Sequence, residues 1–381
     1  MKRVLIAHPY VTATGGANAV AAWALQALRG ECQVSLATLS PIDYAAVNRS
    51  FGTSLKQGDV AVFLAPARYH QLLRVVRTPG ALLEHQLTVR LARNIDRKLR
   101  FDVLLSTHNE VDFGRRGIQY VNLPGAYLPR PDQEVRWSHR IPGLHRAFRA
   151  ACQIVGRSTA KGPLRNVFVA DSYNIARRIR EMYGVESRVL YPPVPGEFPQ
   201  VPWQKRRAGF VAIGRITTCK RWEMAVAILD ELRSRGHDLT LTLIGHREDS
   251  EYERRLRSLT SSRPWFRMVH DLSRVELVQE IASHRYGIHT MQDEHFGIAP
   301  AEILSAGCLP FVHNSGGPVE IVDGNFYLTF ETIADAVEKI SMVLRDPDLE
   351  RRLLDHTAQQ KSRFTTESFC SSLREIVRVF A

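Results

Sequence analysis

The chain has 381 residues, of which 44% are hydrophobic and 24% are charged, so it is long enough for two cores and bulk disorder is excluded. No apolar run reaches the roughly 18–20 residues that span a bilayer, and the short apolar start, residues 1–8, is interrupted too soon for a signal peptide. We therefore expect a cytoplasmic protein without a membrane anchor of its own. The five cysteines are scattered and lack C-x-x-C spacing, which argues against a disulfide framework and a zinc site.

The formal net charge of +12 favours polyanionic partners. Arginine is dense between Arg130 and Arg180. A solvated basic surface and a patch that binds an anionic membrane both explain this density. Nucleic acid is the least favoured partner, because the chain has neither zinc-finger spacing nor an RNA-binding aromatic motif.

Each half of the chain opens with a buried strand, a glycine-bearing turn or polar loop, and a helix. The pattern predicts a strand at 4–7 and a helix at 17–28 in the first half, and a strand at 209–214 and a helix at 221–234 in the second. Further strand-like runs follow at 34–37, 60–64, 103–106, 118–121, 167–170, 239–244, 267–269, 286–289 and 309–312. Short apolar strands separated by helices predict an α/β fold: two Rossmann-like domains, each with a parallel sheet covered on both faces.

Five prolines between residues 191 and 202 cannot continue a helix or a central strand. We therefore expect a stiff linker at 191–208 between an N-terminal domain, 1–190, and a C-terminal domain, 209–364. The last helix, 365–381, has apolar residues at helical spacing and is expected to pack back on the first domain. Ligands of open parallel sheets bind beyond the carboxyl ends of the strands, so the site is expected in a cleft between the two domains.

The most informative segment runs from Glu294 to Glu302, between a predicted strand and a predicted helix. The first turn of a helix exposes N–H groups and a positive dipole end, which suit a diphosphate. Glu302 would then accept hydrogen bonds from ribose hydroxyls, and Glu294 would lie beside a sugar attached to the phosphate. Two surface glutamates around a helix that starts at a proline explain the same segment equally well.

A second loop, from Gly214 to Lys220, also follows a strand. Arg215 can bind phosphate oxygens with two parallel hydrogen bonds, and Lys220 adds a point charge. Together they could neutralise a diphosphate leaving group without a metal, which matches the lack of a D-x-D motif for Mg²⁺ between the strands. A solvated helix start is the alternative interpretation of this loop.

Glycines mark two further loops, at Gly15-Gly16 and at Gly316-Gly317. Glycine allows a ligand to approach the backbone closely, although a plain turn explains each loop as well. His8 and His108 each end a predicted strand, and we expect them to be packed or exposed loop histidines rather than catalysts.

In this order along the chain, the motifs resemble the GT-B retaining glycosyltransferases of family 4. The motifs that carry the resemblance are Gly15-Gly16-Ala17-Asn18, Ala170-Asp171-Ser172, Gly214-Arg215 with Lys220, Glu294 with Glu302, and Gly316-Gly317-Pro318 with Glu320. Residues 294–298 and 313–318 look most like the dolichol-pathway α-1,2-mannosyltransferases and related bacterial mannosyltransferases. In that branch a strand ends in a Tyr-Val-His-Tyr-Pro-like segment, and here Asn122 stands where the histidine would be. An amide can bind a sugar hydroxyl but cannot titrate near neutral pH.

The resemblance implies a metal-independent hexosyltransferase that retains the anomeric configuration, needs no cofactor and uses GDP-mannose, with a UDP-sugar as the alternative donor. It implies a catalytic role for Glu294, Arg215, Lys220 and Asn122, and donor binding by Gly16, Arg215, Lys220, Glu294, Phe296, Gly297, Ile298 and Glu302. The acceptor would be a lipid-linked, polysaccharide or other glycan bound near residues 115–140, with the enzyme peripheral at the inner face of the membrane. Two alternatives stay open: a non-catalytic nucleotide-sugar or nucleic-acid binding protein on the same scaffold, and a nucleotide-sugar epimerase.

Overall fold

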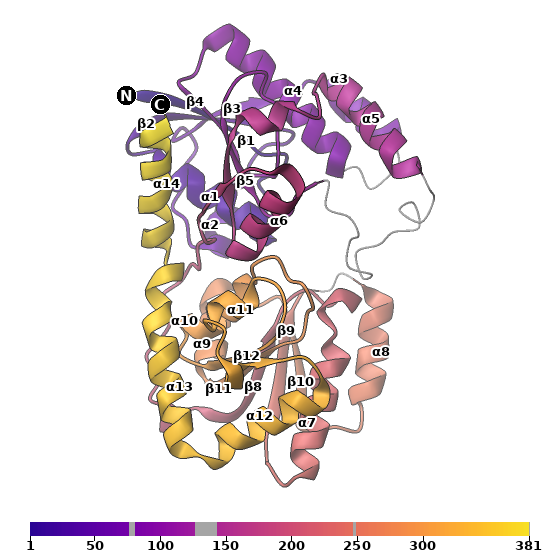
Figure 1. Cartoon of the computed structure of the whole chain (residues 1–381), viewed down its shortest axis with the longest axis vertical. Coiled ribbons are helices and arrows are strands. Elements are labelled where there is room, and N and C mark those ends of the chain that lie inside the picture. Colours follow the sequence, from indigo (N-terminus) through magenta and orange to yellow (C-terminus); the bar gives the residue numbers. More distant parts are fainter. Residues whose placement is uncertain (76–80, 126–142, 247–248, 381) are drawn as a thin grey trace. The chain divides into compact units, whose positions relative to one another are not determined.

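A computed structural model describes residues 1–75, 81–125, 143–246 and 249–380 of the chain. These residues form two compact units: residues 1–193 with 366–381, called unit 1, and residues 194–365, called unit 2. Each unit holds a parallel sheet with helices packed against it (Figure 1). The predicted α/β class with two Rossmann-like domains is confirmed.

The proline-rich stretch that we expected to be a linker lies largely within unit 2. The Val194 N–H group donates a hydrogen bond to the Phe364 carbonyl oxygen at 2.9 Å, and the side chains of Phe198 and Val201 pack on the core of unit 2. These contacts give the stretch a fixed place in unit 2, which its proline content alone does not indicate.

The sheet of unit 1 has the strand order β3-β2-β1-β4-β5-β6-β7, and all its pairs are parallel. Its strands are β1 (Lys2–Ala7), β2 (Cys32–Thr38), β3 (Ala61–Leu64), β4 (Val103–Ser106), β5 (Ile118–Val121), β6 (Val167–Ala170) and β7 (Ser187–Val189). In the central strand β1, residues 4–7 are all buried because helices cover both faces of the sheet. The strand order reverses between β1 and β4, which makes their carboxyl ends the switch point of this sheet.

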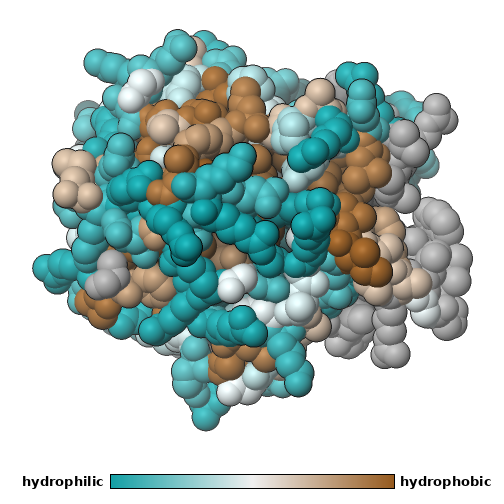
Figure 2. All heavy atoms as spheres, turned by 90° about the horizontal axis from the view of Figure 1, so that it is seen from above, coloured by the Kyte–Doolittle hydropathy of each residue, from teal (hydrophilic) through white to brown (hydrophobic). Residues whose placement is uncertain are grey.

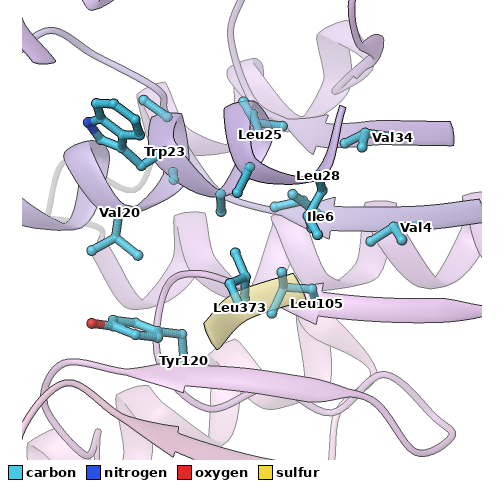
Figure 3. Packing of buried hydrophobic residues seen from close by; sticks show 14 of the residues in the cluster. Val4, Ile6, Val20, Trp23, Leu25, Leu28, Val34, Leu105, Tyr120 and Leu373 are labelled. Carbon is cyan, nitrogen blue, oxygen red and sulfur yellow. The ribbon is translucent and has the colours of Figure 1, made fainter. Parts of the chain in front are cut away.

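The helices of unit 1 are α1 (Gly16–Leu28), α2 (Tyr44–Phe51), α3 (Ala67–Val75), α4 (Ala81–Leu99), α5 (Leu144–Gly156), α6 (Tyr173–Tyr183) and α14 (Thr366–Phe380). The last of these, α14, packs beside α1. Figure 3 shows side chains of α1, including Val20, Trp23, Leu25 and Leu28, gathered with Ile6 of β1, Tyr120 of β5 and Leu373 of α14. The core of unit 1 therefore includes both its first helix and the last helix of the chain.

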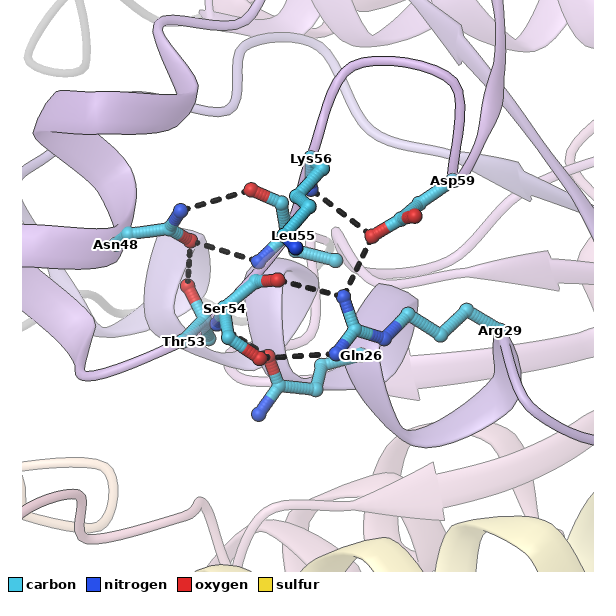
Figure 4. A network of polar contacts seen from close by, with 8 residues as sticks. All are labelled: Gln26, Arg29, Asn48, Thr53, Ser54, Leu55, Lys56 and Asp59. Atoms are coloured by element: carbon cyan, nitrogen blue, oxygen red, sulfur yellow. Dashed lines mark hydrogen bonds and ion pairs between the residues drawn. The ribbon is translucent and has the colours of Figure 1, made fainter.

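A polar network fixes the turn between α2 and β3 (Figure 4). The Asn48 amide oxygen accepts hydrogen bonds from the Thr53 hydroxyl at 2.7 Å and the Leu55 N–H at 3.0 Å. Arg29 donates to the Ser54 carbonyl oxygen at 2.7 Å and to the Asp59 carboxylate at 2.5 Å. Side chains thus satisfy backbone groups in a loop that has no ladder partner.

The sheet of unit 2 has the order β10-β9-β8-β11-β12-β13, and its switch point lies between β8 and β11. Its strands are β8 (Arg207–Ile213), β9 (Thr240–Gly245), β10 (Phe266–His270), β11 (His284–His289), β12 (Leu309–His313) and β13 (Thr329–Phe330). Its helices are α7 (Trp222–Ser234), α8 (Ser250–Thr260), α9 (Arg274–Ala282), α10 (Ile298–Ser305), α11 (Pro318–Ile321), α12 (Ile333–Arg345) and α13 (Pro347–Gln360). Short 3₁₀ turns lie at Gly162–Arg165 in unit 1, and at Trp203–Lys205, Thr218–Lys220, Phe326–Leu328 and Lys361–Phe364 in unit 2.

Hydrophilic side chains cover much of the face in Figure 2, and apolar side chains gather in patches between them. In the part of the chain that the structure describes, no helix combines the length and the apolar character needed to cross a membrane.

Candidate functional site

Two loops leave the sheet of unit 2 at its switch point, where ligands of parallel α/β sheets bind. The loop after β8 carries Arg215 and ends in the 3₁₀ turn Thr218–Lys220. The loop after β11 carries Glu294 and leads into α10. The switch point therefore brings together side chains that lie 74 residues apart in the sequence.

Lys220 and Glu294 form an ion pair across these loops, and their side chains are only 10% and 16% exposed. The Thr290 hydroxyl donates to the Lys220 carbonyl oxygen at 2.7 Å, which fixes the backbone that carries the ammonium group. Burial alone would raise the pKa of Glu294, but the Lys220 charge and the neighbouring His289 hold this pKa well below its ordinary value. The Glu294 carboxylate therefore stays charged and can accept hydrogen bonds from hydroxyl groups.

His289, the last residue of β11, is a buried neighbour of this pair that the sequence analysis did not single out. Its Nε2 atom lies 3.4 Å from the Glu294 carboxylate, and burial lowers the pKa of its imidazole. One feature of the sequence does indicate that His289 lies near the candidate site. It ends a predicted strand, directly before the candidate loop.

Arg215 lies in the loop after β8 and is exposed. The Trp222 indole N–H donates to the Arg215 carbonyl oxygen at 3.1 Å, so the backbone of this loop is tied to the first turn of α7. This arrangement leaves the exposed guanidinium at the same edge of the sheet as Lys220.

Glu302 lies on α10 and is buried, 7% exposed. Its partner is Arg274 of α9, which forms an ion pair with the Glu302 carboxylate and also donates to the Pro195 carbonyl oxygen. Arg274 could not be predicted from the sequence, because it lies 28 residues from Glu302 and outside any motif. The pair fixes the direction of the carboxylate within unit 2.

The start of α10 depends on Gly297, whose φ of +96° lies in the left-handed region. A Cβ atom at this position would lie 2.8 Å from Cγ of Pro300, closer than van der Waals contact allows. Pro300 has no N–H group, and the Ala301 N–H bonds to the Gly297 carbonyl oxygen at 3.3 Å. The first turn of α10 can therefore offer a ligand the N–H groups of Ile298 and Ala299.

Phe296, also predicted to bind the donor, is 3% exposed. Its ring packs against Phe364, with 5.7 Å between the ring centroids. The side chain therefore belongs to the core of unit 2, and only its backbone is available to a ligand.

The loop after β12 supports the backbone on both sides of Glu294. The Gly317 N–H donates to the Glu294 carbonyl oxygen at 2.8 Å, and the Ser315 hydroxyl accepts from the Asp293 N–H at 2.8 Å. A Cβ atom on Gly316 would lie 2.2 Å from the Glu294 carbonyl oxygen. Only a glycine allows this approach, so the glycines here serve the position of Glu294.

The remaining predicted residues lie in unit 1. Gly16 is the exposed first residue of α1, and Asn122 follows β5, where its N–H group donates to the Asn109 amide oxygen at 3.0 Å. Residues 126–140 of the predicted acceptor region are outside the residues that the structure describes. Across the described ranges, no three His, Cys, Asp or Glu side chains are grouped as they would be around a metal ion.

Residues 195–360, most of unit 2, match the sequence family described as Glycosyl transferases group 1. The whole chain superposes on sucrose-phosphate synthase from Thermosynechococcus elongatus with a TM-score of 0.70 and 13% identity, covering 100% of this chain and 99% of that one. The fold is therefore that of the GT-B glycosyltransferases, and residues 195–360 of unit 2 resemble the group 1 glycosyltransferases.

Two relatives share the name "GDP-Man:Man(3)GlcNAc(2)-PP-Dol alpha-1,2-mannosyltransferase". The protein of Mus musculus is 30% identical over 148 residues, which are 35% of this chain and 30% of that protein. The protein of Homo sapiens is 26% identical over 206 residues, which are 48% of this chain and 42% of that protein. The chain thus matches less than half the length of these relatives, and its similarity to these mannosyltransferases is limited to that part.

Proposed function

We propose that the protein transfers mannose from GDP-mannose to a lipid-linked or other glycan acceptor, with retention of the anomeric configuration and without a metal ion. The buried Lys220–Glu294 pair at the switch point of the matched domain carries this proposal. The names of the relatives support mannose as the sugar and a lipid-linked glycan as the acceptor.

Three groups in unit 2 suit the diphosphate of the donor. The Lys220 ammonium has three donors, so one can stay on Glu294 while the others bind phosphate oxygens. The Arg215 guanidinium adds two parallel donors, and the N–H groups at the start of α10 add the positive end of a helix. These fixed donors stabilise the negative charge that grows on the diphosphate as its bond to the sugar breaks.

The two carboxylates suit the rest of the donor. Glu294 accepts hydrogen bonds from hydroxyls of the transferred sugar, and Glu302, held by Arg274, accepts them from the ribose. The acceptor oxygen forms its bond to the anomeric carbon on the face from which the phosphate oxygen leaves, and the acceptor proton passes to that phosphate oxygen. No side chain of the protein has to act as a base in this scheme.

The net charge of +12 supports an acceptor that is held at an anionic membrane surface by a cytoplasmic, peripheral enzyme. Comparing transfer to a lipid-linked mannoside in vesicles with transfer to a soluble mannoside tests this part of the proposal. Equal rates with both acceptors would contradict it.

The first test measures hydrolysis of GDP-mannose without an acceptor, with UDP-hexoses in parallel. We expect slow hydrolysis that falls about 30-fold or more in Lys220→Ala, because the lost cation costs about 2 kcal/mol or more of transition-state stabilisation. Lys205→Ala is the matched control, since Lys205 is an exposed lysine of the same unit. A thermal midpoint for each variant separates lost chemistry from lost folding.

Equal hydrolysis by the wild type, Lys220→Ala and Glu294→Gln would contradict the proposal. Nucleotide binding without any turnover would instead indicate a non-catalytic binding protein. Release of an altered sugar without an acceptor would indicate an epimerase.

A further inference from the structure

Three histidines from different elements meet at the switch point of unit 1. His8 follows β1, His108 follows β4, and His85 reaches them from α4. The ring centroids of His8 and His85 lie 5.5 Å and 5.3 Å from that of His108. His8 and His85 are 1% and 7% exposed, whereas His108 is only partly buried.

The hydrogen bonds of His8 occupy both of its ring nitrogens. Asn18 uses its NH₂ group to donate to the Thr12 hydroxyl and the Thr14 carbonyl oxygen, at 2.7 Å and 2.6 Å. Its amide oxygen must therefore accept from Nε2–H of His8, at 2.9 Å. The His8 Nδ1 atom then accepts from the Thr107 hydroxyl at 2.9 Å, so His8 holds the turn before α1 and has no nitrogen left for a ligand.

The other two histidines form a chain of hydrogen bonds with one direction. His85 Nε2 lies 2.8 Å from the Glu110 carbonyl oxygen, which can only accept, so Nε2 carries the proton. The His85 Nδ1 atom of the neutral ring then has a lone pair, and it lies 3.3 Å from Nδ1 of His108. His108 must therefore donate through Nδ1–H, which leaves its Nε2 atom with a lone pair.

The neutral state on which this assignment depends follows from the surroundings. Burial lowers the pKa of His85. Burial, followed by the neighbouring His85 and His8, also lowers the pKa of His108 well below its ordinary value. Throughout the described ranges, no carboxylate forms an ion pair with His108. The neutral ring therefore keeps the lone pair on Nε2 near neutral pH, so this atom can accept a hydrogen bond. It is too weak a base for efficient general-base catalysis, which needs a pKa near the working pH.

Asn109 ties this cluster to the neighbouring strand end. Its amide oxygen accepts the N–H groups of Asn122 and Leu123 at 3.0 Å and 3.1 Å, and its own N–H donates to the Tyr120 carbonyl oxygen at 3.0 Å. His108 and Asn122 thus follow adjacent strands, and the hydrogen bonds of Asn109 hold the two strand ends together. A fixed lone pair at this edge suits a ligand rich in hydroxyl donors, which describes a glycan.

Building on the proposed function, we propose that Nε2 of His108 accepts a hydrogen bond from a non-reacting hydroxyl group of the acceptor glycan. In this proposal His108 determines acceptor specificity, and His85 is a positioning residue that fixes the tautomer of His108. The acceptor proton still passes to the leaving phosphate, so the imidazole takes no part in proton transfer.

The first experiment reads the tautomer without any turnover. Long-range ¹H–¹⁵N spectra of histidine-labelled protein, assigned with His108→Phe, should show a neutral His108 protonated at Nδ1 between pH 6 and 8. Octyl α-D-mannopyranoside should shift the Nε2 signal. A ring protonated at Nε2, a charged ring at pH 7, or an Nε2 signal that the mannoside does not move would each overturn the proposal.

The second experiment measures transfer from GDP-mannose to octyl α-D-mannopyranoside. We expect His108→Phe to raise the KM for the mannoside about tenfold, as the loss of one directed hydrogen bond predicts. His108→Gln, which keeps an acceptor oxygen, should restore most of this loss, and His85→Gln should raise the same KM. The effect is expected in the KM for the mannoside rather than in kcat, which separates lost acceptor binding from a general loss of activity.

Monodeoxy analogues of the mannoside identify the hydroxyl. One analogue should be about tenfold poorer for the wild type and no poorer than the parent mannoside for His108→Phe, because the two changes remove the same interaction. Additive losses for every analogue would overturn the proposal. His356→Phe, a half-buried histidine of unit 2 outside the site, is the matched control.

Failure of the proposed function would look different, because the wild type and Lys220→Ala would then hydrolyse the donor equally. The spectra show which nitrogen of His108 carries the proton whether or not the protein turns over the donor. Thermal midpoints of the three variants show whether a lost activity reflects lost folding.

Discussion

At the scale of single residues, the two glutamates expected to hold the donor have different partners. Glu294 pairs with Lys220, a cation expected in the same site, whereas Glu302 pairs with Arg274. The Arg274 and Glu302 side chains are 11% and 9% exposed, so each depends on the other for compensation of its charge. Removing one partner of such a pair costs more than removing both.

We therefore expect Arg274→Met to lower the free energy of unfolding by about 3–5 kcal/mol, because it leaves a buried carboxylate without its cation. The double variant Arg274→Met/Glu302→Leu should recover most of that loss, since both charges are gone. Urea unfolding of the two variants checks this, with Arg254→Met on the exposed surface of α8 as the control. A single variant as stable as this control would show that the pair does not matter for folding.

The proximity of some candidate residues could be predicted from the sequence and that of others could not, for a physical reason. Lys220 and Glu294 follow strands at loops that parallel topology brings together, so local pattern and topology predicted both. Arg274 is the first residue of α9 and His85 lies within α4, and their contacts come only from side chains that meet them in three dimensions. His8 and His108 were expected to be packed or loop histidines, and no local pattern showed that they share a third ring.

At the scale of elements, the loop after β12 holds the loop after β11 in place through contacts with the backbone around Glu294. Gly316 has a φ of +72° and its missing Cβ leaves room for the Glu294 carbonyl oxygen, whereas Gly324 has a φ of +65° and open space around it. Both glycines thus have a left-handed backbone conformation, but only Gly316 has another group where a Cβ atom would lie.

We expect Gly324→Ala to cost about 1 kcal/mol of stability, from its backbone conformation alone, and to leave donor hydrolysis unchanged. Gly316→Ala should cost more and lower donor hydrolysis at least tenfold, because the added methyl group displaces the loop that carries Glu294. Calorimetry and a hydrolysis assay on both variants check this. Equal losses of stability and of hydrolysis in the two variants would mean that the close approach of Gly316 to the Glu294 carbonyl oxygen is unimportant.

The elements differ in how well a pattern could predict them. Central strands such as β4 and β5 are buried along their whole length and are mostly apolar, so their bounds were predicted. The edge strands β7 and β13 have three and two residues, too few to show a pattern. The helix α10 starts at Ile298 rather than at Pro300 because Gly297 turns the backbone there.

At the scale of the whole molecule, buried neutral histidines make stability depend on pH. Burial lowers the pKa of His8 from the ordinary value of 6.5 to about 4. Between these values the unfolded chain binds the proton and the folded chain does not, so stability is fully present above about pH 6.5 and falls as the pH falls towards 4. This one residue can account for about 3 kcal/mol of that loss.

We therefore expect the thermal midpoint of the wild type to fall between pH 7 and pH 4.5, and to fall less steeply in His8→Gln. A pH series of melting curves for the two proteins checks this. Parallel curves would show that His8 titrates alike in the folded and unfolded chains.

The hydrogen bond between Val194 and Phe364, with the bridge between Val194 and Thr365, joins the places where the chain enters and leaves unit 2. A module whose two ends touch can be exchanged without redirecting the polypeptide that hosts it. In the proposed function unit 2 binds the donor, so exchanging residues 194–365 for the matching span of a relative is expected to change the donor preference and to leave the acceptor preference unchanged.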